Sequence, residues 1–125
     1  MKQIIKTTKA AQPVGPYNQA VKVNGTLYVS GQIPIDPVIG ELVKGDVHDQ
    51  TRMVMQNMGA ILEAAGMDFT NVVKCSIFIS DMHDFPKINE VYAAYFKEDP
   101  PARETVQVGA LPKFVDVEIS CVAVE

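Results

Sequence analysis

Two hydrophobic periods follow one another along this chain, and their order limits the possible folds more than any other feature. Between Asp46 and Ala65 the core-type positions recur every three or four residues, which predicts a long amphipathic helix. These positions are Val47, Thr51, Val54, Met58, Ile61, Leu62 and Ala65. Gly66 follows directly as a candidate C-terminal cap. Residues 71–80 then change to a period of two, which predicts a strand. Its faces carry Val73, Cys75, Ile77 and Ile79 on one side and Lys74, Ser76, Phe78 and Ser80 on the other.

The same succession of helix and strand returns in the second half of the chain. Asp84 is a candidate N-cap, and Pro86 lies in the first turn of the predicted helix. The apolar stripe of this helix is Ile88, Val91, Tyr92, Tyr95 and Phe96. Asp99-Pro100-Pro101 ends it, because proline cannot continue a helix. Two further strands are predicted over residues 103–108 and 115–124.

The first third of the chain is typical of antiparallel strands. QIIK, QAVKV and TLYVSGQI have strand character, and Asn24-Gly25 between the last two favours a tight hairpin turn. The predicted order is therefore β-β-β-α-β-α-β-β in one domain, residues 1–125. Strands that alternate with helices favour right-handed parallel crossovers, so we expect an α+β layer with both helices on one face of a mixed sheet.

One face of that sheet would have no helix to cover it. Alternation assigns to this uncovered face Tyr28, Ser30, Phe78, Thr105, Glu118, Val122 and Val124. The set is too apolar for a solvated surface and too polar for a closed core. Such a face usually meets another subunit, so the pattern predicts a homo-oligomer.

Composition excludes several classes of protein. The chain has 125 residues, of which 47% are hydrophobic and 21% charged, and no apolar run approaches the roughly 18 to 20 residues of a membrane span. No signal-peptide pattern is present, so a cytoplasmic location is expected. The net charge is −4, and no cluster of Lys and Arg is available to bind nucleic acid. Cys75 and Cys121 stand among β-branched residues, which predicts buried, reduced thiols.

Conventional catalytic signatures are missing from the sequence. There is no P-loop, G-x-G-x-x-G, G-x-S-x-G or C-x-x-C motif, and His48 and His83 have no partner at metal-ligand spacing. No metal or cofactor is therefore expected. The polar residues that stand out lie within predicted strands: Arg103, Thr105 and Gln107 share one strand face, and Asp116, Glu118 and Ser120 share the corresponding face of the last strand.

Arg103 and Glu118 are the strongest candidates for chemistry. A guanidinium can hold a carboxylate by two parallel hydrogen bonds, so Arg103 could bind a small acid while Glu118 moves protons. Alternatively, the two side chains form only an ion pair at a sheet edge or a subunit interface. Tyr17, after the Gly15-Pro16 turn, is either a packing aromatic or a ligand contact. Gly31 within a strand indicates a bulge or a close ligand, with the Ser30 hydroxyl beside it.

Six segments of the chain resemble, in order and spacing, the reactive intermediate deaminase family, also called RidA or YjgF. They are GPYNQAV, VSGQIP, NMGAILEAAG, VVKCSIFISDMHDFPKINEVYAAYF, PPARETVQV and LPKFVDVEISCVAV, which span nearly the whole chain. The resemblance implies a chorismate-mutase-like fold with a mixed six-stranded sheet, two helices on one face, and a homotrimer with sites between subunits. In that fold the last strand lies beside the strand of Cys75. Arg103 and Glu118 would then be two strands, about 10 Å, apart within one chain.

The activity that the resemblance implies is hydrolysis of enamines and imines such as 2-aminoacrylate. Pyridoxal-phosphate enzymes release these compounds when they dehydrate serine or threonine, and the products are a 2-keto acid and ammonia. The family's carboxylate-binding arginine corresponds to Arg103, its acid/base glutamate to Glu118, and its tyrosine in the G-P-Y turn to Tyr17. The positions that match the pocket lining are Ser30, Gly31 and Asn89.

Thr105 departs from the common pattern of the family, in which many members have a cysteine two residues after the arginine. A thiol nucleophile is therefore absent, but imine hydrolysis needs only an activated water, and the threonine hydroxyl can still hydrogen-bond the substrate. In the expected mechanism Arg103 orients the imine, and Glu118 helps to deliver water to the carbon and a proton to the nitrogen. Tyr17 and the backbone near Gly31 align the rest.

Two other functions compete with the deaminase. One is a non-catalytic trimer that binds small keto acids or acts as a chaperone through the same Arg103 clamp. The other is an endoribonuclease, a label that some relatives carry; the acidic composition and the absence of a paired-histidine motif argue against it.

Overall fold

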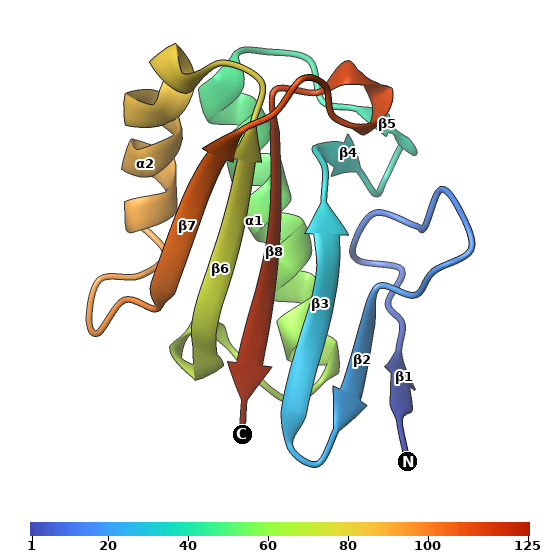
Figure 1. Ribbon diagram of the computed structural model, residues 1–125. Coiled ribbons are helices and arrows are strands. Elements are labelled where there is room, and N and C mark those ends of the chain that lie inside the picture. Colours follow the sequence, from blue (N-terminus) through green and yellow to red (C-terminus); the bar gives the residue numbers. More distant parts are fainter.

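The final strand of the chain occupies the middle of a mixed six-stranded sheet. The computed structural model describes residues 1–125, and Figure 1 shows the strands in the order β1-β2-β3-β8-β6-β7. Their bounds are β1 (Gln3–Ile5), β2 (Ala20–Val23), β3 (Thr26–Gln32), β6 (Val72–Ile79), β7 (Ala102–Gln107) and β8 (Val117–Val124). β6 and β7 are parallel, and the other neighbouring strands are antiparallel. As the family resemblance implied, β8 pairs with β3 and β6 and does not form a hairpin with β7.

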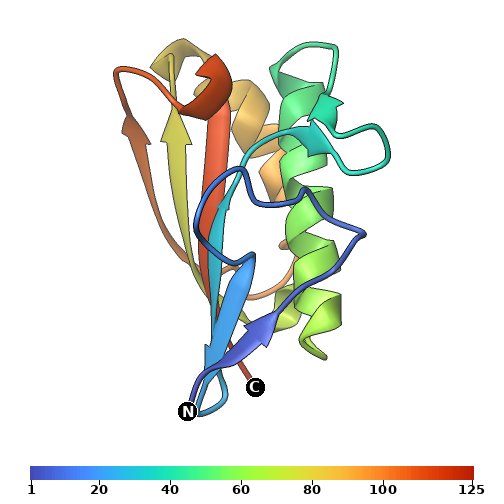
Figure 2. The ribbon, with the colours of Figure 1, turned by 90° about the vertical axis from the view of Figure 1, so that its right-hand side faces the viewer.

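Both helices lie on the same face of this sheet, as predicted. Figure 2 shows α1 (Val47–Ala64) and α2 (Phe85–Ala93) on one side and the strands on the other. Buried side chains of the helices and of the inward strand faces form the main core; the largest are Leu27, Met55, Met58, Ile61, Leu62, Ile77, Ile79, Ile88 and Ile119. Full burial of each such side chain stabilises the fold by about 1.5–3 kcal/mol. Neither helix is long and apolar enough to cross a bilayer.

The ends of α1 are defined by local chemistry that the sequence already contains. The Asp46 side chain accepts a hydrogen bond from the Asp49 N–H, and the Asp49 side chain accepts one from the Asp46 N–H, which forms a capping box. At the other end Gly66 adopts φ +74°. Its N–H donates to the Glu63 carbonyl while the Met67 N–H donates to the Leu62 carbonyl, the pattern of a Schellman cap.

α2 begins at Phe85 with Pro86 in its first turn, as predicted, but the side chain of Asp84, the predicted N-cap, makes no capping hydrogen bond. The helix is also shorter than its apolar stripe predicted. The helix ends at Ala93, and the next residues form i to i+3 bonds, including one from the Phe96 N–H to the Ala93 carbonyl. This tighter turn brings the Phe96 ring to 5.5 Å from the Phe69 ring. The aromatic cluster therefore ends the helix three residues before the predicted stripe does.

Register decides which side chains face the helices, and it corrects two predictions. The β6–β8 pairing shifts between Val72 and Lys74, so Val72 is buried and Val73, predicted on the inner face, is exposed. Thr105 is paired in parallel register with the buried Ile77. It therefore lies on the helix side of β7 and not on the uncovered face, where simple alternation had placed it.

The remainder of the uncovered face is as predicted. Tyr28 and Val124 are exposed there, and Glu118 and Val122 are half-buried. Asn24-Gly25 makes the tight β2–β3 turn, with both residues at positive φ. The sequence did not predict a second, two-stranded sheet of β4 (Ile35–Asp36) and β5 (Glu41–Leu42), which the buried Asn57 amide of α1 holds by donating to the Ile35 carbonyl.

Candidate functional site

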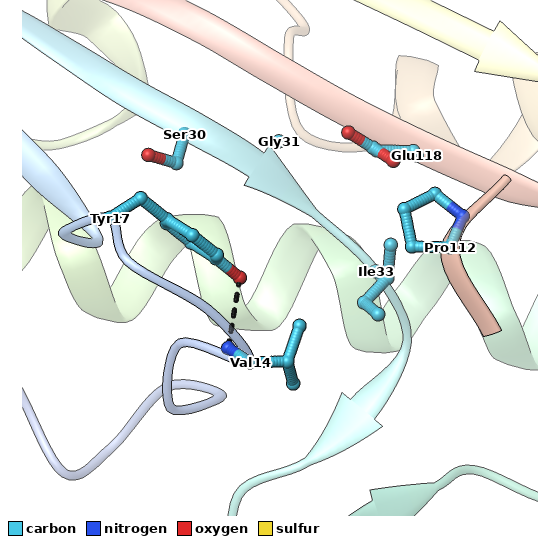
Figure 3. A pocket seen from close by; sticks show the side chains of 7 residues that line it. All are labelled: Val14, Tyr17, Ser30, Gly31, Ile33, Pro112 and Glu118. Atoms are coloured by element: carbon cyan, nitrogen blue, oxygen red, sulfur yellow. Dashed lines mark hydrogen bonds between the residues drawn. The ribbon is translucent and has the colours of Figure 1, made fainter.

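The candidate site residues divide into two groups on opposite faces of the sheet. The first group lines a pocket of about 290 Å³ beside the end of β3. Figure 3 shows its seven lining residues, which are Val14, Tyr17, Ser30, Gly31, Ile33, Pro112 and Glu118. Four of them were predicted as site residues from the sequence, and Val14, Ile33 and Pro112 were not.

Gly31 and Glu118 are in contact because β3 is irregular at this point. The register of β3 against β8 shifts between Val29 and Gln32, which is the bulge that a glycine within a strand indicated. A Cβ atom at Gly31 would overlap Oε2 of Glu118 and would lie 2.8 Å from its Cδ. The glycine thus leaves the space in which the carboxyl group rests against the strand backbone.

The environment of Glu118 favours its neutral form. Burial raises the pKa of the Glu118 carboxyl above its ordinary value, and no cation of this chain lies within ion-pair distance of it. A carboxyl group with a raised pKa can both accept and return a proton nearer neutral pH. Glu118 therefore has the properties of a general acid/base.

The wall opposite Glu118 is a loop that folds on itself. The Tyr17 N–H donates to the Gly15 carbonyl, and the Tyr17 hydroxyl accepts a hydrogen bond of 3.3 Å from the Val14 N–H, the dashed line in Figure 3. The Ser30 hydroxyl donates to the Asn18 carbonyl at 2.6 Å. The buried Gln19 side chain anchors this loop, since its amide donates to the Thr7 and Ala11 carbonyls and accepts from the Thr7 N–H group.

The second group surrounds Arg103 on the helix side of β7. A pocket of about 320 Å³ is lined by Asn89, Tyr92, Ala93, Phe96, Pro100, Pro101 and Arg103. Nη1 of Arg103 donates to Oδ1 of Asn89 at 2.7 Å, and no carboxylate of the chain pairs with the guanidinium. The two prolines before β7 form one wall of the pocket. Arg103 is therefore an exposed cation with free hydrogen-bond donors.

Thr105 and Glu104 project from opposite faces of β7. The Thr105 hydroxyl is buried and has no hydrogen-bond partner within the chain. Glu104 faces the uncovered side, where it pairs with Lys74 at 2.9 Å and accepts a hydrogen bond from the Ser76 hydroxyl. The Thr105 hydroxyl therefore has an unused hydrogen-bonding capacity, although Thr105 lines neither pocket.

Arg103 and Glu118 do not share a face, which corrects the sequence-based expectation. Arg103 is in register with the buried Cys75, whereas Glu118 is in register with Phe78 on the other side of β6. An ion pair between Arg103 and Glu118 within one chain is excluded by this arrangement. One chain therefore has two separate pockets, one lined by Arg103 and the other by Glu118.

The sequence did not reveal which side chains hold Arg103. The rings of Phe85 and Tyr92 lie 5.3 and 5.1 Å from Cζ of the guanidinium. Tyr92 had been assigned only to the core stripe of its helix, and no local signal connects it with a residue eleven positions later. No group of three or more His, Cys, Asp or Glu side chains gathers at either pocket. Cys75 and Cys121 are buried free thiols, as predicted, and burial raises the pKa of Cys75.

The sequence and the fold match one family of proteins. The chain belongs to the family described as Endoribonuclease L-PSP, whose model matches residues 7–125. Two structures show the same fold over nearly the whole chain. A Rid-family protein of Yersinia pestis has a TM-score of 0.97 at 46% identity and covers 100% of both chains. Escherichia coli TdcF, determined with bound serine, has a TM-score of 0.94 at 42% identity and covers 98% of both.

Curated relatives are similar over an equally large part of the chain. A RutC family protein of Pyrococcus horikoshii is 54% identical over 123 residues, which covers 98% of this chain and 98% of that protein. The human 2-iminobutanoate/2-iminopropanoate deaminase is 49% identical over 125 residues, which covers 100% of this chain and 91% of the human protein. The resemblance to the RidA/YjgF family is therefore confirmed.

Proposed function

We propose that this protein is a hydrolytic deaminase that converts 2-imino and 2-enamino acids into 2-keto acids and ammonia. The observation that carries the proposal is the unpaired Arg103 cation at the mouth of a small pocket, in a chain that is 49% identical to the human deaminase. An exposed guanidinium without a carboxylate partner suits a substrate that brings its own carboxylate. TdcF with its bound serine shows that a relative accommodates a small molecule with that group.

The proposed reaction uses Glu118 as the group that moves protons. Arg103 binds the carboxylate of the imine form, which places the C=N carbon beside Glu118. The ionised Glu118 accepts a proton from a water molecule as the water oxygen bonds to this carbon. Glu118 returns this proton to the nitrogen, which gives a tetrahedral intermediate with a hydroxyl and an amino group on the same carbon. Glu118 then takes the hydroxyl proton and passes it to the amino nitrogen, the C–N bond breaks, ammonia leaves and the C=O bond of the keto acid forms. The residues present can perform these steps without a metal or cofactor.

The other predicted site residues hold or complete this arrangement. Asn89 orients the guanidinium through its hydrogen bond of 2.7 Å. The unpaired Thr105 hydroxyl can donate to the substrate, a role that does not need the cysteine found there in many relatives. Tyr17 and Ser30 shape the wall of the Glu118 pocket, and Gly31 admits the carboxyl group.

A complete site requires two subunits under this proposal. Arg103 and Glu118 project from opposite faces of the sheet, so they can flank one substrate only if they belong to different chains. The partly apolar uncovered face, which includes Tyr28, Val106 and Val124 as exposed side chains, supplies a surface for association. We propose a homotrimer with three such sites. Its substrates would come from pyridoxal-phosphate enzymes that dehydrate serine or threonine, in the cytoplasm.

The first part of the test is a coupled assay. Purified protein is added to a pyridoxal-phosphate threonine dehydratase, and keto-acid formation is followed beside a blank without the protein and beside the Arg103→Ala variant. We expect the protein to accelerate keto-acid formation over the blank, and the Arg103→Ala variant to lose this acceleration. Formation no faster than the blank, with a folded protein, would refute the deaminase.

The second part mixes two inactive variants. Arg103→Ala and Glu118→Gln subunits are unfolded together and refolded, or coexpressed. If each site takes its arginine and its glutamate from different chains, random mixing restores about one quarter of the sites in a cyclic oligomer. No restoration in a mixed trimer would mean that both residues of a site come from one chain.

The competing functions predict different outcomes. A non-catalytic binder of keto acids would bind the product through Arg103 without accelerating its formation. The family description names an endoribonuclease, but the net charge is −4. Binding to RNA that weakens steeply with added salt would be needed to favour that activity.

A further inference from the structure

The guanidinium of Arg103 lies between two aromatic rings of α2. Its Cζ atom is 5.3 Å from the centroid of the Phe85 ring and 5.1 Å from that of the Tyr92 ring. Both distances fall within the range of about 6 Å over which a cation is attracted by the face of an aromatic ring. Arg103 is exposed and forms no ion pair with any residue of the chain. The chain therefore places aromatic rings, and no carboxylate, against this guanidinium.

The three side chains that hold Arg103 come from a single face of the helix. Phe85, Asn89 and Tyr92 are spaced by four and three residues, which aligns them along one side of α2. Residues seven positions apart are separated by about 10 Å along a helix axis. Cζ lies at nearly equal distances from both ring centroids, and Oδ1 of Asn89, which stands between Phe85 and Tyr92 on the helix, accepts a hydrogen bond from Nη1.

We propose that Phe85 and Tyr92 are positioning residues that hold the two faces of the Arg103 guanidinium, so that only its free edge is offered to the substrate carboxylate. This inference rests on the proposed function, because it describes how the acid-binding group of that site is oriented. A protein carboxylate in the same place would also fix the arginine, but it would compete with the substrate for the same donors. Aromatic faces orient the cation and leave its charge and its edge available.

The surroundings of Tyr92 explain why a ring, and not a hydroxyl, is needed there. Tyr92 is 4% exposed, and its hydroxyl has no hydrogen-bond partner in the chain. Burial raises the pKa of this hydroxyl, first by desolvation and then through the adjacent Cys75 thiol. The ring therefore stays neutral, and a phenylalanine would lose only a weak contact of the hydroxyl with the Cys75 thiol. Tyr92→Phe is for this reason the conservative variant that should retain the function of the residue.

The test compares four variants that differ in what they remove. Tyr92→Leu and Phe85→Leu each remove one ring beside Arg103, and Tyr92→Phe keeps the ring. Tyr95→Leu is the matched control: Tyr95 lies two residues after the end of α2, and its ring packs on the Phe69 ring at 5.1 Å and not on the guanidinium. Two measurements are made on each: titration with the product 2-oxobutanoate by NMR, and KM and kcat in the coupled assay.

Each ring-removing variant should weaken keto-acid binding and raise KM by about two- to fivefold, with a smaller change in kcat. Tyr92→Phe should restore the affinity, and Tyr95→Leu should not alter it. In an Arg103→Ala background the ring substitutions should have no further effect on binding, because the group they position is gone. Equal losses with and without Arg103, or an equal loss in Tyr95→Leu, would overturn the proposal.

A ligand-free measurement separates this proposal from the proposed function. The Nε–Hε signal of Arg103 should shift in Phe85→Leu and in Tyr92→Leu, because the ring currents of the two aromatics act on it, and should not shift in Tyr95→Leu. An unchanged signal in both ring variants would refute the positioning role whether or not the protein turns over imines. If the Arg103 signal shifts in both ring variants but the wild-type protein does not hydrolyse imines, the proposed deaminase function is refuted and the positioning role is not. Because Phe85 is only half-buried, its variant is available if Tyr92→Leu fails to fold.

Discussion

The contact between Gly31 and Glu118 leads to the most specific prediction, since one added methyl group should act on catalysis and not on folding. A Cβ at Gly31 would lie 2.8 Å from Cδ and 3.1 Å from Cγ of Glu118, and would overlap Oε2. To reach an ordinary contact of 3.4 Å, the carboxyl carbon must retreat by about 0.6 Å and its oxygen by more. The side chain can do so because its far end is flexible, and Gly31 does not have a positive φ that would strain alanine.

The expected magnitude follows from that displacement. Misplacing a catalytic group by roughly 1 Å can cost about 100-fold in rate, which corresponds to about 2.7 kcal/mol of transition-state stabilisation. We expect Gly31→Ala to lower kcat by about that factor, while the free energy of unfolding changes by no more than about 1 kcal/mol.

The matched control for this substitution is Gly109→Ala. A Cβ at Gly109 would meet no atom within 4 Å, and this glycine also lacks a positive φ. Coupled-assay kinetics and urea unfolding of both variants give the result. If Gly31→Ala keeps the wild-type kcat, then Glu118 does not act from the position that the bulge provides.

Two further predictions concern Glu118 and the start of α1. Glu118→Gln should lower kcat by about 100-fold or more. Burial raises the pKa of Glu118 in the folded state above the ordinary 4.5, so the free energy of unfolding of the wild type falls as the pH rises from 4.5 through the raised pKa. In urea unfolding the variant should therefore gain stability relative to wild type as the pH rises from 4.5 through the raised pKa of Glu118. A stability difference that does not change with pH would contradict the buried carboxyl. Asp46→Ala removes the side-chain acceptor of the α1 capping box and should cost about 1 kcal/mol, with Asp46→Asn costing less. Thermal melting should show a midpoint lower by about 3–6 °C with an unchanged rate at 25 °C, and an unaltered midpoint would mean that the cap contributes little.

Most of the fold could be predicted because its signals are local. The capping box at Asp46, the glycine at position 66 and the Asn24-Gly25 turn each define a boundary through atoms only a few residues apart. The errors occurred where tertiary contacts override a local pattern. α2 ended early because aromatic packing drew Phe96 into a tighter turn, and Val73 faced outward because the pairing with β8 shifts beside it.

The arrangement of the predicted site residues depends on the tertiary structure. Family resemblance selected these residues, but it is the fold that places Tyr17, Ser30, Gly31 and Glu118 at one pocket, Asn89 and Arg103 at another, and Thr105 at neither. The sequence could not show that Arg103 and Glu118 project from opposite faces of the sheet. Periodicity within a strand indicates which residues share a face, but not which face of the sheet that is. Parallel pairing with β6 determines this for β7.

The sequence by itself determined the element types, the helix caps and the residue types that can bind a carboxylate and move a proton, since these depend on neighbours along the chain. Only the tertiary structure decided that β8 lies between β3 and β6, that Glu118 rests against Gly31, and that Arg103 is held between Phe85 and Tyr92. Each of those contacts joins residues from different elements. Their proximity depends on strand order and register, which are set by how the whole chain buries its apolar faces.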